Sequence, residues 1–105
     1  MAQHDFVAVG QLTDIPDGTM KSVDAGGKKI TLIHIGDSIF AIDDTCSHAQ
    51  CSFAAEGFLD GSSVICGCHG SQFDISTGRV LSLPAITDIG TYGVKITDGK
   101  ILVSV

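Results

Sequence analysis

The sequence predicts an all-β protein, a small antiparallel β-sandwich or barrel that carries one inserted segment rich in cysteine and glycine. Short apolar runs alternate with turn signals about every 8–12 residues, which is typical of such folds. Thirteen glycines stand against only two prolines. No stretch of useful length has the spacing of apolar residues that a helix requires. The 105 residues suit a single domain, residues 1–105.

The expected strands are short runs rich in β-branched and aromatic residues. They lie at residues 5–9, 19–24, 29–35, 38–42, 62–65, 72–74, 93–97 and 101–105. The nearly continuous apolar run Ile30–Ile35 fits a central strand that packs on both faces. Within residues 47–56 at most one short turn of helix is expected.

The expected turns contain glycine, aspartate or proline, the residues that tolerate turn conformations. They are Pro16-Asp17-Gly18, Gly26-Gly27, Gly36-Asp37, Asp60-Gly61, Thr77-Gly78 and Asp98-Gly99. Asp98-Gly99 stands between two apolar runs and is a strong hairpin signal.

The cysteines are concentrated in one segment, since all four lie within residues 45–79 together with five glycines. Glycine permits the tight turns and close backbone approach that a metal-binding loop needs. We therefore expect a base formed by residues 1–44 and 80–105, with residues 45–79 inserted as a metal-binding subdomain.

Composition excludes some classes of protein. The net charge of −6 argues against nucleic-acid binding, which needs a basic face. It suits a small carrier that is steered to basic patches on larger partners, although it also serves solubility alone. No run approaches the roughly 20 apolar residues of a membrane span, and residues 1–5 do not resemble a signal peptide. We expect a cytoplasmic protein without a membrane anchor.

Two short boxes carry the chemistry, Cys46-Ser47-His48 and Cys66-Gly67-Cys68-His69. Each offers a thiolate and an imidazole, in the order C-x-H … C-x-x-H. Two Cys and two His suit a [2Fe–2S] cluster in which one iron takes sulfur ligands and the other takes nitrogen. Neutral imidazoles leave the cluster less negative, which raises its potential from about −400 mV to roughly −150 to +300 mV.

Other metal or thiol chemistry matches these boxes less well. Structural zinc also uses two Cys and two His, but usually pairs like residues at short spacing. A plant-type cluster would need a cysteine where Ala54 stands, and a c-type haem needs C-x-x-C-H. A Cys68–His69 nucleophile is disfavoured because adjacent residues on an extended chain point to opposite faces. Zinc remains the alternative that iron analysis would separate.

The two boxes resemble those of Rieske iron–sulfur proteins. The second box continues through Gly70-Ser71-Gln72-Phe73-Asp74, and Thr77-Gly78 and Pro84-Ala85 also fit, so that the likeness covers about residues 40–86. The resemblance implies that Cys46 and Cys66 hold a buried iron, and that His48 and His69 hold the outer iron. It also implies a small antiparallel β-sandwich with the cluster-binding subdomain at its tip.

Seven further residues receive roles from the same resemblance. Cys51 and Cys68 would form a disulfide between the two loops, as in Rieske proteins of respiratory and photosynthetic complexes; the alternative is two buried free thiols. Such a bridge is unusual in a reducing cytosol. Ser71 would donate to a cluster sulfide and raise the potential. Phe73 stands where high-potential members often have tyrosine, unless it is simply a core aromatic. Leu83-Pro84 would cover the cluster, and Phe53, Leu83 and Pro84 would surround the exposed histidine edges.

Three other polar residues receive ordinary roles. His34 is expected to be a strand residue, since no cysteine stands at a useful spacing from it. Asp43-Asp44 is expected to be a solvated turn, with docking as its alternative role.

The resemblance implies an electron carrier that is not itself an enzyme. Such a protein is a soluble, monomeric Rieske-type ferredoxin, which takes electrons from a flavin-containing reductase and passes them to the terminal oxygenase of a ring-hydroxylating dioxygenase. The runner-up is a high-potential Rieske protein related to quinol-oxidising or arsenite-oxidase complexes, which Ser71 and the Cys51/Cys68 pair favour. A small subunit of nitrite reductase and a zinc-stabilised binding module are further alternatives.

Overall fold

The computed structural model describes residues 6–44, 52–53, 57–67, 71–82 and 89–104. In these ranges nearly all regular structure is β-strand, apart from the short 3-10 helix η1 (Leu12–Asp14). All strand pairs are antiparallel, so the predicted fold class is confirmed. Within the same ranges, no helix has the length and apolar character needed to cross a membrane.

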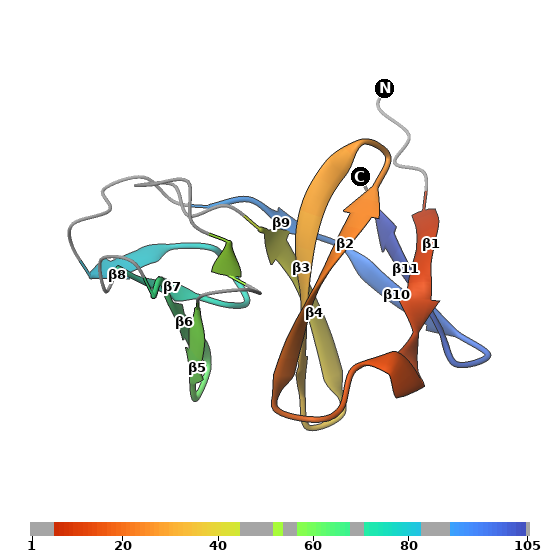
Figure 1. Ribbon diagram of the computed structural model, residues 1–105, viewed down its shortest axis with the longest axis horizontal. Helices are drawn as coiled ribbons and strands as arrows, with labels where there is room; N and C mark the ends of the chain where they lie inside the picture. The colour runs from red at the N-terminus through yellow and green to blue at the C-terminus, as the bar shows by residue number, and fades with distance from the viewer. Residues whose placement is uncertain (1–5, 45–51, 54–56, 68–70, 83–88, 105) are drawn as a thin grey trace.

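The strands form three sheets. The first has the order β1-β11-β10 and comprises β1 (Phe6–Gln11), β11 (Lys100–Ser104) and β10 (Val94–Thr97). The second has the order β2-β3-β4-β9 and comprises β2 (Thr19–Ala25), β3 (Lys28–Ile35), β4 (Ser38–Asp43) and β9 (Thr91–Tyr92). The third follows the chain order and comprises β5 (Phe58–Asp60), β6 (Ser63–Ile65), β7 (Gln72–Asp74) and β8 (Val80–Ser82). The second sheet lies between the other two (Figure 1).

Strand β3 packs on both faces, as its apolar run predicts. Alternate residues of a strand point to opposite faces, and here Ile30 and Leu32 belong to one core while Ile33 belongs to the other. The core between the first and second sheets contains Ile15, Ala25, Ile30, Leu32, Ala41, Ile101 and Val103. The core between the second and third sheets contains Ile33, Ile42, Phe53, Val64, Cys66, Phe73, Ile75 and Ile89.

The predicted hairpin at Asp98-Gly99 is confirmed. Thr97 pairs with Lys100, so the connection has two residues, and both have positive φ, 51° at Asp98 and 76° at Gly99. These backbone angles match the twist of two-residue hairpins, and aspartate and glycine tolerate them better than other residues do.

The remaining differences from prediction concern short elements. Strands β5, β8 and β9 and the helix η1 were not expected from the sequence. They have only two or three residues each, too few to show a period. Strands β5 and β8 form by pairing with the adjacent strands β6 and β7, whereas β9 forms by pairing with the distant strand β4, Tyr92 opposite Ala41. The division into base and insertion stays a prediction, and β8 lies just past its expected boundary at residue 79.

Candidate metal centre

Cys66 is the predicted ligand that the structure describes. It directly follows β6, is 1% exposed and is a free thiol. The other predicted ligands, Cys46, His48 and His69, lie outside the described residues, as do Cys51, Cys68, Leu83 and Pro84. Among the residues that are described, no three His, Cys, Asp or Glu side chains form a metal-binding group.

The second box forms a loop that is closed at its base. The Cys66 backbone N–H donates to the Ser71 carbonyl at 2.7 Å, immediately beyond the paired residues Ile65 and Gln72. Ser71 is fully buried. This bond joins the two residues between which the chain segment with Cys68 and His69 runs, and it extends the pairing of β6 with β7.

The first box is also closed at its base. The Phe53 backbone N–H donates to the Asp44 carbonyl at 2.7 Å, and the Asp44 N–H donates to the Lys29 carbonyl of β3 at 3.2 Å. Residues 45–52 therefore connect two points that a backbone hydrogen bond holds together. This segment contains Cys46 and His48.

The bases of the two loops are packed against each other. The rings of Phe53 and Phe73 meet edge to face, with their centroids 5.5 Å apart. A Cβ at Gly57 would lie 2.6 Å from the Phe53 carbonyl oxygen and 3.0 Å from that of Ile65, so the chain leaving the first loop runs directly along β6. Both predicted ligand loops thus originate at neighbouring backbone positions.

The expectation of a solvated turn at Asp43-Asp44 is wrong. Asp44 is 3% exposed, and its Oδ1 accepts hydrogen bonds from the Thr31 hydroxyl at 2.6 Å and the Ser52 hydroxyl at 2.8 Å. Buried carboxylates need such donors because burial removes their hydration. The donors come from distant parts of the chain, which is why local sequence does not reveal them.

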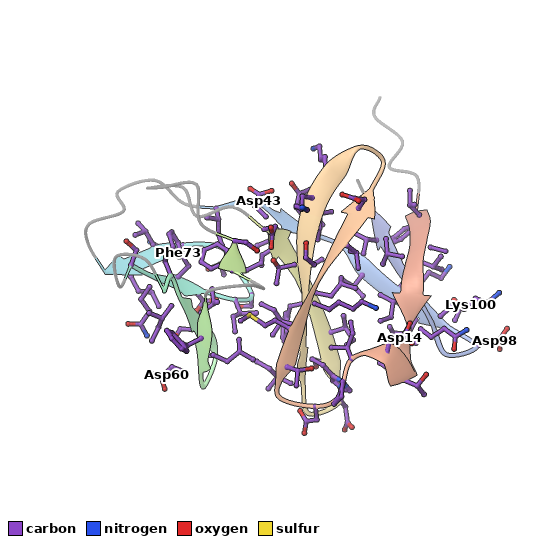
Figure 2. The ribbon with its side chains drawn as sticks, viewed as in Figure 1. Asp14, Asp43, Asp60, Phe73, Asp98 and Lys100 are labelled. Atoms are coloured by element: carbon purple, nitrogen blue, oxygen red, sulfur yellow. The ribbon has the colours of Figure 1, made fainter. Side chains whose placement is uncertain are left out.

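The neighbouring carboxylate serves a different segment. Asp43, which is labelled in Figure 2, accepts hydrogen bonds from the Gly90 N–H at 2.7 Å and from the Tyr92 hydroxyl. Burial, together with the bond to Asp43 and its charge, raises the pKa of Tyr92 to about 12. Asp43 therefore fixes the start of β9.

Phe53 does not lie where a docking residue would lie. It is 1% exposed and packs in the core between the second and third sheets, so it cannot contact a partner at the surface. Its edge-to-face contact with Phe73 explains this burial, since aromatic pairs gain from such packing beyond their buried area. Phe73 is itself fully buried in the same core, as its alternative role predicted.

His34 is a strand residue of β3, as expected. Its ring Nδ1 lies 2.6 Å from the Ile15 carbonyl oxygen, and Nε2 lies 2.9 Å from that of Gly36. The imidazole therefore connects the segment after η1 with the β3–β4 turn.

Sequence reasoning did not single out Thr31, Ser52 or Gly57. A threonine in a strand and a serine or glycine in a loop are ordinary, and only their contacts with Asp44, Phe53 and Ile65 give them a part in the site. The nearly continuous apolar run around Thr31 offered one signal, because it placed a hydroxyl between buried residues of β3.

Fold and site define a small all-β protein with two adjoining loops that carry Cys and His. A family model described as "Rieske [2Fe-2S] domain" matches residues 5–93. The chain therefore belongs to the Rieske [2Fe–2S] domain family, and its cofactor is one Rieske-type [2Fe–2S] cluster.

Relatives and solved structures agree with this family. The ferredoxin component of the naphthalene 1,2-dioxygenase/salicylate 5-hydroxylase systems of Ralstonia sp. is 36% identical over 98 residues, which cover 93% of each chain. The ferredoxin of carbazole 1,9a-dioxygenase from Nocardioides aromaticivorans IC177 has a TM-score of 0.89 at 30% identity, covering 94% of this chain and 96% of that one. A chain from a complex of reduced oxygenase and oxidized ferredoxin in carbazole 1,9a-dioxygenase has a TM-score of 0.88 at 30% identity, with coverage of 97% and 94%.

The described residues fit this cofactor. A thiol must be deprotonated to bind iron, and Cys66 offers its sulfur from a core that excludes water. The loops on either side are fixed at their bases by the bonds of Asp44 and Ser71. Such rigid support is what a site assembled from two loops requires.

Proposed function

We propose that this chain is the ferredoxin component of a multicomponent dioxygenase, carrying single electrons from a flavin-containing reductase to a terminal oxygenase. The observation that carries the proposal is the extent of the likeness. The Ralstonia ferredoxin component and this chain each match over 93% of their length, so the likeness is to a separate carrier protein. On this proposal no bond of an organic substrate changes on the chain, which is not itself an enzyme.

The ligands in this proposal are Cys46 and Cys66 for one iron and His48 and His69 for the other. The burial of Cys66 supports its assignment to the inner iron. The cluster supplies one-electron redox chemistry. The core around Cys66 excludes water, the histidine edges would serve for contact with a partner, and the charge of −6 favours encounter with basic surfaces.

Two side chains beside the site bear on its potential. Hydrogen bonds to cluster sulfurs stabilise the reduced state and raise the potential. Ser71, buried at the end of the second loop, would supply one such bond, whereas Phe73 has no hydroxyl to supply another. We therefore expect a potential between those of low-potential ferredoxins and high-potential Rieske proteins.

A disulfide between Cys51 and Cys68 is a further part of the proposal. It would link the two loops directly, and the chain-entropy model gives about 3 kcal/mol for a loop of this length. Intact-mass measurement of protein purified without reductant tests it, since the bridge lowers the mass by two hydrogens.

Reconstitution tests the proposed function. The purified protein should contain iron and sulfide and show a Rieske-type electron paramagnetic resonance signal. With the reductase and terminal oxygenase of a naphthalene dioxygenase system, it should be required for product formation. A colourless, zinc-loaded protein would overturn the cluster assignment. A protein that holds the cluster but accepts no electrons from flavin-containing reductases would overturn the role in a dioxygenase.

The midpoint potential separates the proposal from the quinol-linked alternative. A value at or moderately above about −150 mV that does not vary with pH around neutrality supports the ferredoxin. A strongly positive value that falls as pH rises would favour the alternative. His48→Cys should lower the potential, because a thiolate adds negative charge to the cluster, and an unchanged potential would contradict His48 as a ligand. Size-exclusion chromatography and fractionation of the producing cell test the expectations of a monomer and of a cytoplasmic location.

A further inference from the structure

We propose that Asp44 is a positioning residue for the cluster: its carboxylate and its backbone together fix both ends of the first ligand loop to strand β3. The proposal rests on the assignment of Cys46 and His48 as ligands, because these residues lie in the loop that Asp44 would hold.

The contacts of Asp44 reach both ends of this loop. Asp44 directly precedes it, and at its far end the Ser52 hydroxyl donates to Asp44 Oδ1 at 2.8 Å. The Phe53 N–H donates to the Asp44 carbonyl at 2.7 Å. One residue therefore accepts a side-chain bond and a backbone bond from the two consecutive residues at which the loop returns.

The same residue is tied to the central strand. The Thr31 hydroxyl donates to the same Oδ1 at 2.6 Å, and the Asp44 N–H donates to the Lys29 carbonyl at 3.2 Å. Thr31 is fully buried and lies on β3, the strand that both cores share. The ends of the loop are thus fixed to a strand whose central residues are buried in both cores.

A carboxylate is an unusual choice if packing were the only need. Burying a charge is costly, and apolar side chains of similar size often stabilise a core equally well. Hydrogen bonds to a carboxylate are shorter, stronger and more directional than apolar contacts. The arrangement therefore fixes the two ends of the first ligand loop, at Asp44 and at Ser52 and Phe53, and the proposal is that these fixed ends position Cys46 and His48 for the cluster.

The test, in the holoprotein, distinguishes a change in the geometry of the loop from a general loss of stability. Asp44→Ala removes the acceptor, Ser52→Ala removes one donor at the loop end, and Ser52→Thr retains a hydroxyl. Val103→Ala is the matched control, since Val103 is fully buried in the other core and its truncation weakens the fold away from the loop. The readouts are the rate of iron release to a chelator, the electron paramagnetic resonance g-values, the visible circular dichroism and the melting temperature.

Asp44→Ala and Ser52→Ala should release iron faster, by about tenfold or more, with shifted g-values, whereas Ser52→Thr should resemble the wild type. Val103→Ala should melt earlier with unchanged g-values. The proposal is overturned if the loop variants keep the wild-type g-values and release iron no faster than Val103→Ala. If Asp44→Ala does not fold, the comparison of Ser52→Ala with Ser52→Thr tests the proposal. Absence of iron from the wild type would instead overturn the proposed function.

Discussion

A single methyl group added at residue 57 tests how closely the first ligand loop is packed against the strand that leads to Cys66. In Gly57→Ala the new Cβ would lie 2.6 Å from the Phe53 carbonyl oxygen, 3.0 Å from the Ile65 carbonyl oxygen and 3.1 Å from the Phe53 Cα. All three atoms belong to the backbone, so no flexible side chain can move aside. The chain after the first loop must therefore shift away from β6.

Two opposing effects set the magnitude. Overpacking of this kind costs typically about 1–3 kcal/mol. Replacing glycine by alanine restricts the unfolded chain and returns roughly 0.4–1 kcal/mol. The steric term is larger, and a net loss of about 1–2 kcal/mol corresponds to a fall in melting temperature of roughly 4–8 °C for a domain of this size.

Gly93→Ala is the matched control. Within the described part of the chain, a Cβ there would meet only the Ser104 Cβ, at 3.5 Å, which is an ordinary contact. Neither Gly57 nor Gly93 has positive φ, so alanine is compatible with both backbones. The gain from the unfolded state should therefore appear alone, as a melting temperature that is unchanged or slightly higher.

The assay is thermal unfolding of the two holoproteins by far-ultraviolet circular dichroism at one scan rate, with visible circular dichroism to follow the cluster. Gly57→Ala should melt earlier and alter the visible spectrum, whereas Gly93→Ala should do neither. If Gly57→Ala melted at or above the wild-type temperature with an unaltered spectrum, the close contact between the loop exit and β6 would be refuted.

Three further predictions concern hydrogen-bonded groups. The Ser76 hydroxyl, with nearby backbone N–H groups, lowers the pKa of Asp74 below its usual 3.8. This stabilisation is present above about pH 4 and is lost as the pH falls through the lowered pKa of the native state. Asp74→Ala should therefore melt at a lower temperature than the wild type at pH 7 and at the same temperature at about pH 2. Equal melting temperatures at pH 7 would contradict this prediction. The pKa of Tyr92 is raised to about 12, so its contribution is complete below the ordinary value of 10.0 and is lost as pH rises toward about 12. Tyr92→Phe should lose the bond to Asp43 at neutral pH, but its melting temperature should fall less than that of the wild type as the pH rises. Melting curves between about pH 8 and 12 test this, and an equal fall in both proteins would contradict it. Ser71→Ala should lower the midpoint potential by roughly 20–60 mV, the equivalent of one ordinary hydrogen bond for a one-electron couple; potentiometry showing no decrease would remove Ser71 from the tuning role.

Local pattern was sufficient for the longer strands and for the chemistry of the boxes. Apolar and β-branched residues predicted β2, β3 and β4 to within a residue or so at each end. Asp98-Gly99 predicted its hairpin because few pairs of residues tolerate two consecutive positive φ angles. The two Cys and His boxes can likewise be read from the sequence, because the residues of each box lie within a few positions of one another.

Tertiary structure decided what depends on residues far apart in sequence. Asp43 and Asp44 look like a solvated turn, yet Thr31 supplies a donor that allows the Asp44 carboxylate to be buried, and Gly90 supplies one to the partly buried Asp43. Phe53 looks like a surface aromatic beside a metal loop, yet Phe73 gives it a buried partner.

The sequence by itself therefore determined the fold class, the longer strands and the family. The tertiary structure decided which residues fix the ligand loops in place. The physical reason is that backbone propensity and ligand type are properties of a residue and its immediate neighbours. Burial and hydrogen-bond satisfaction, in contrast, depend on which distant strands fold against that residue.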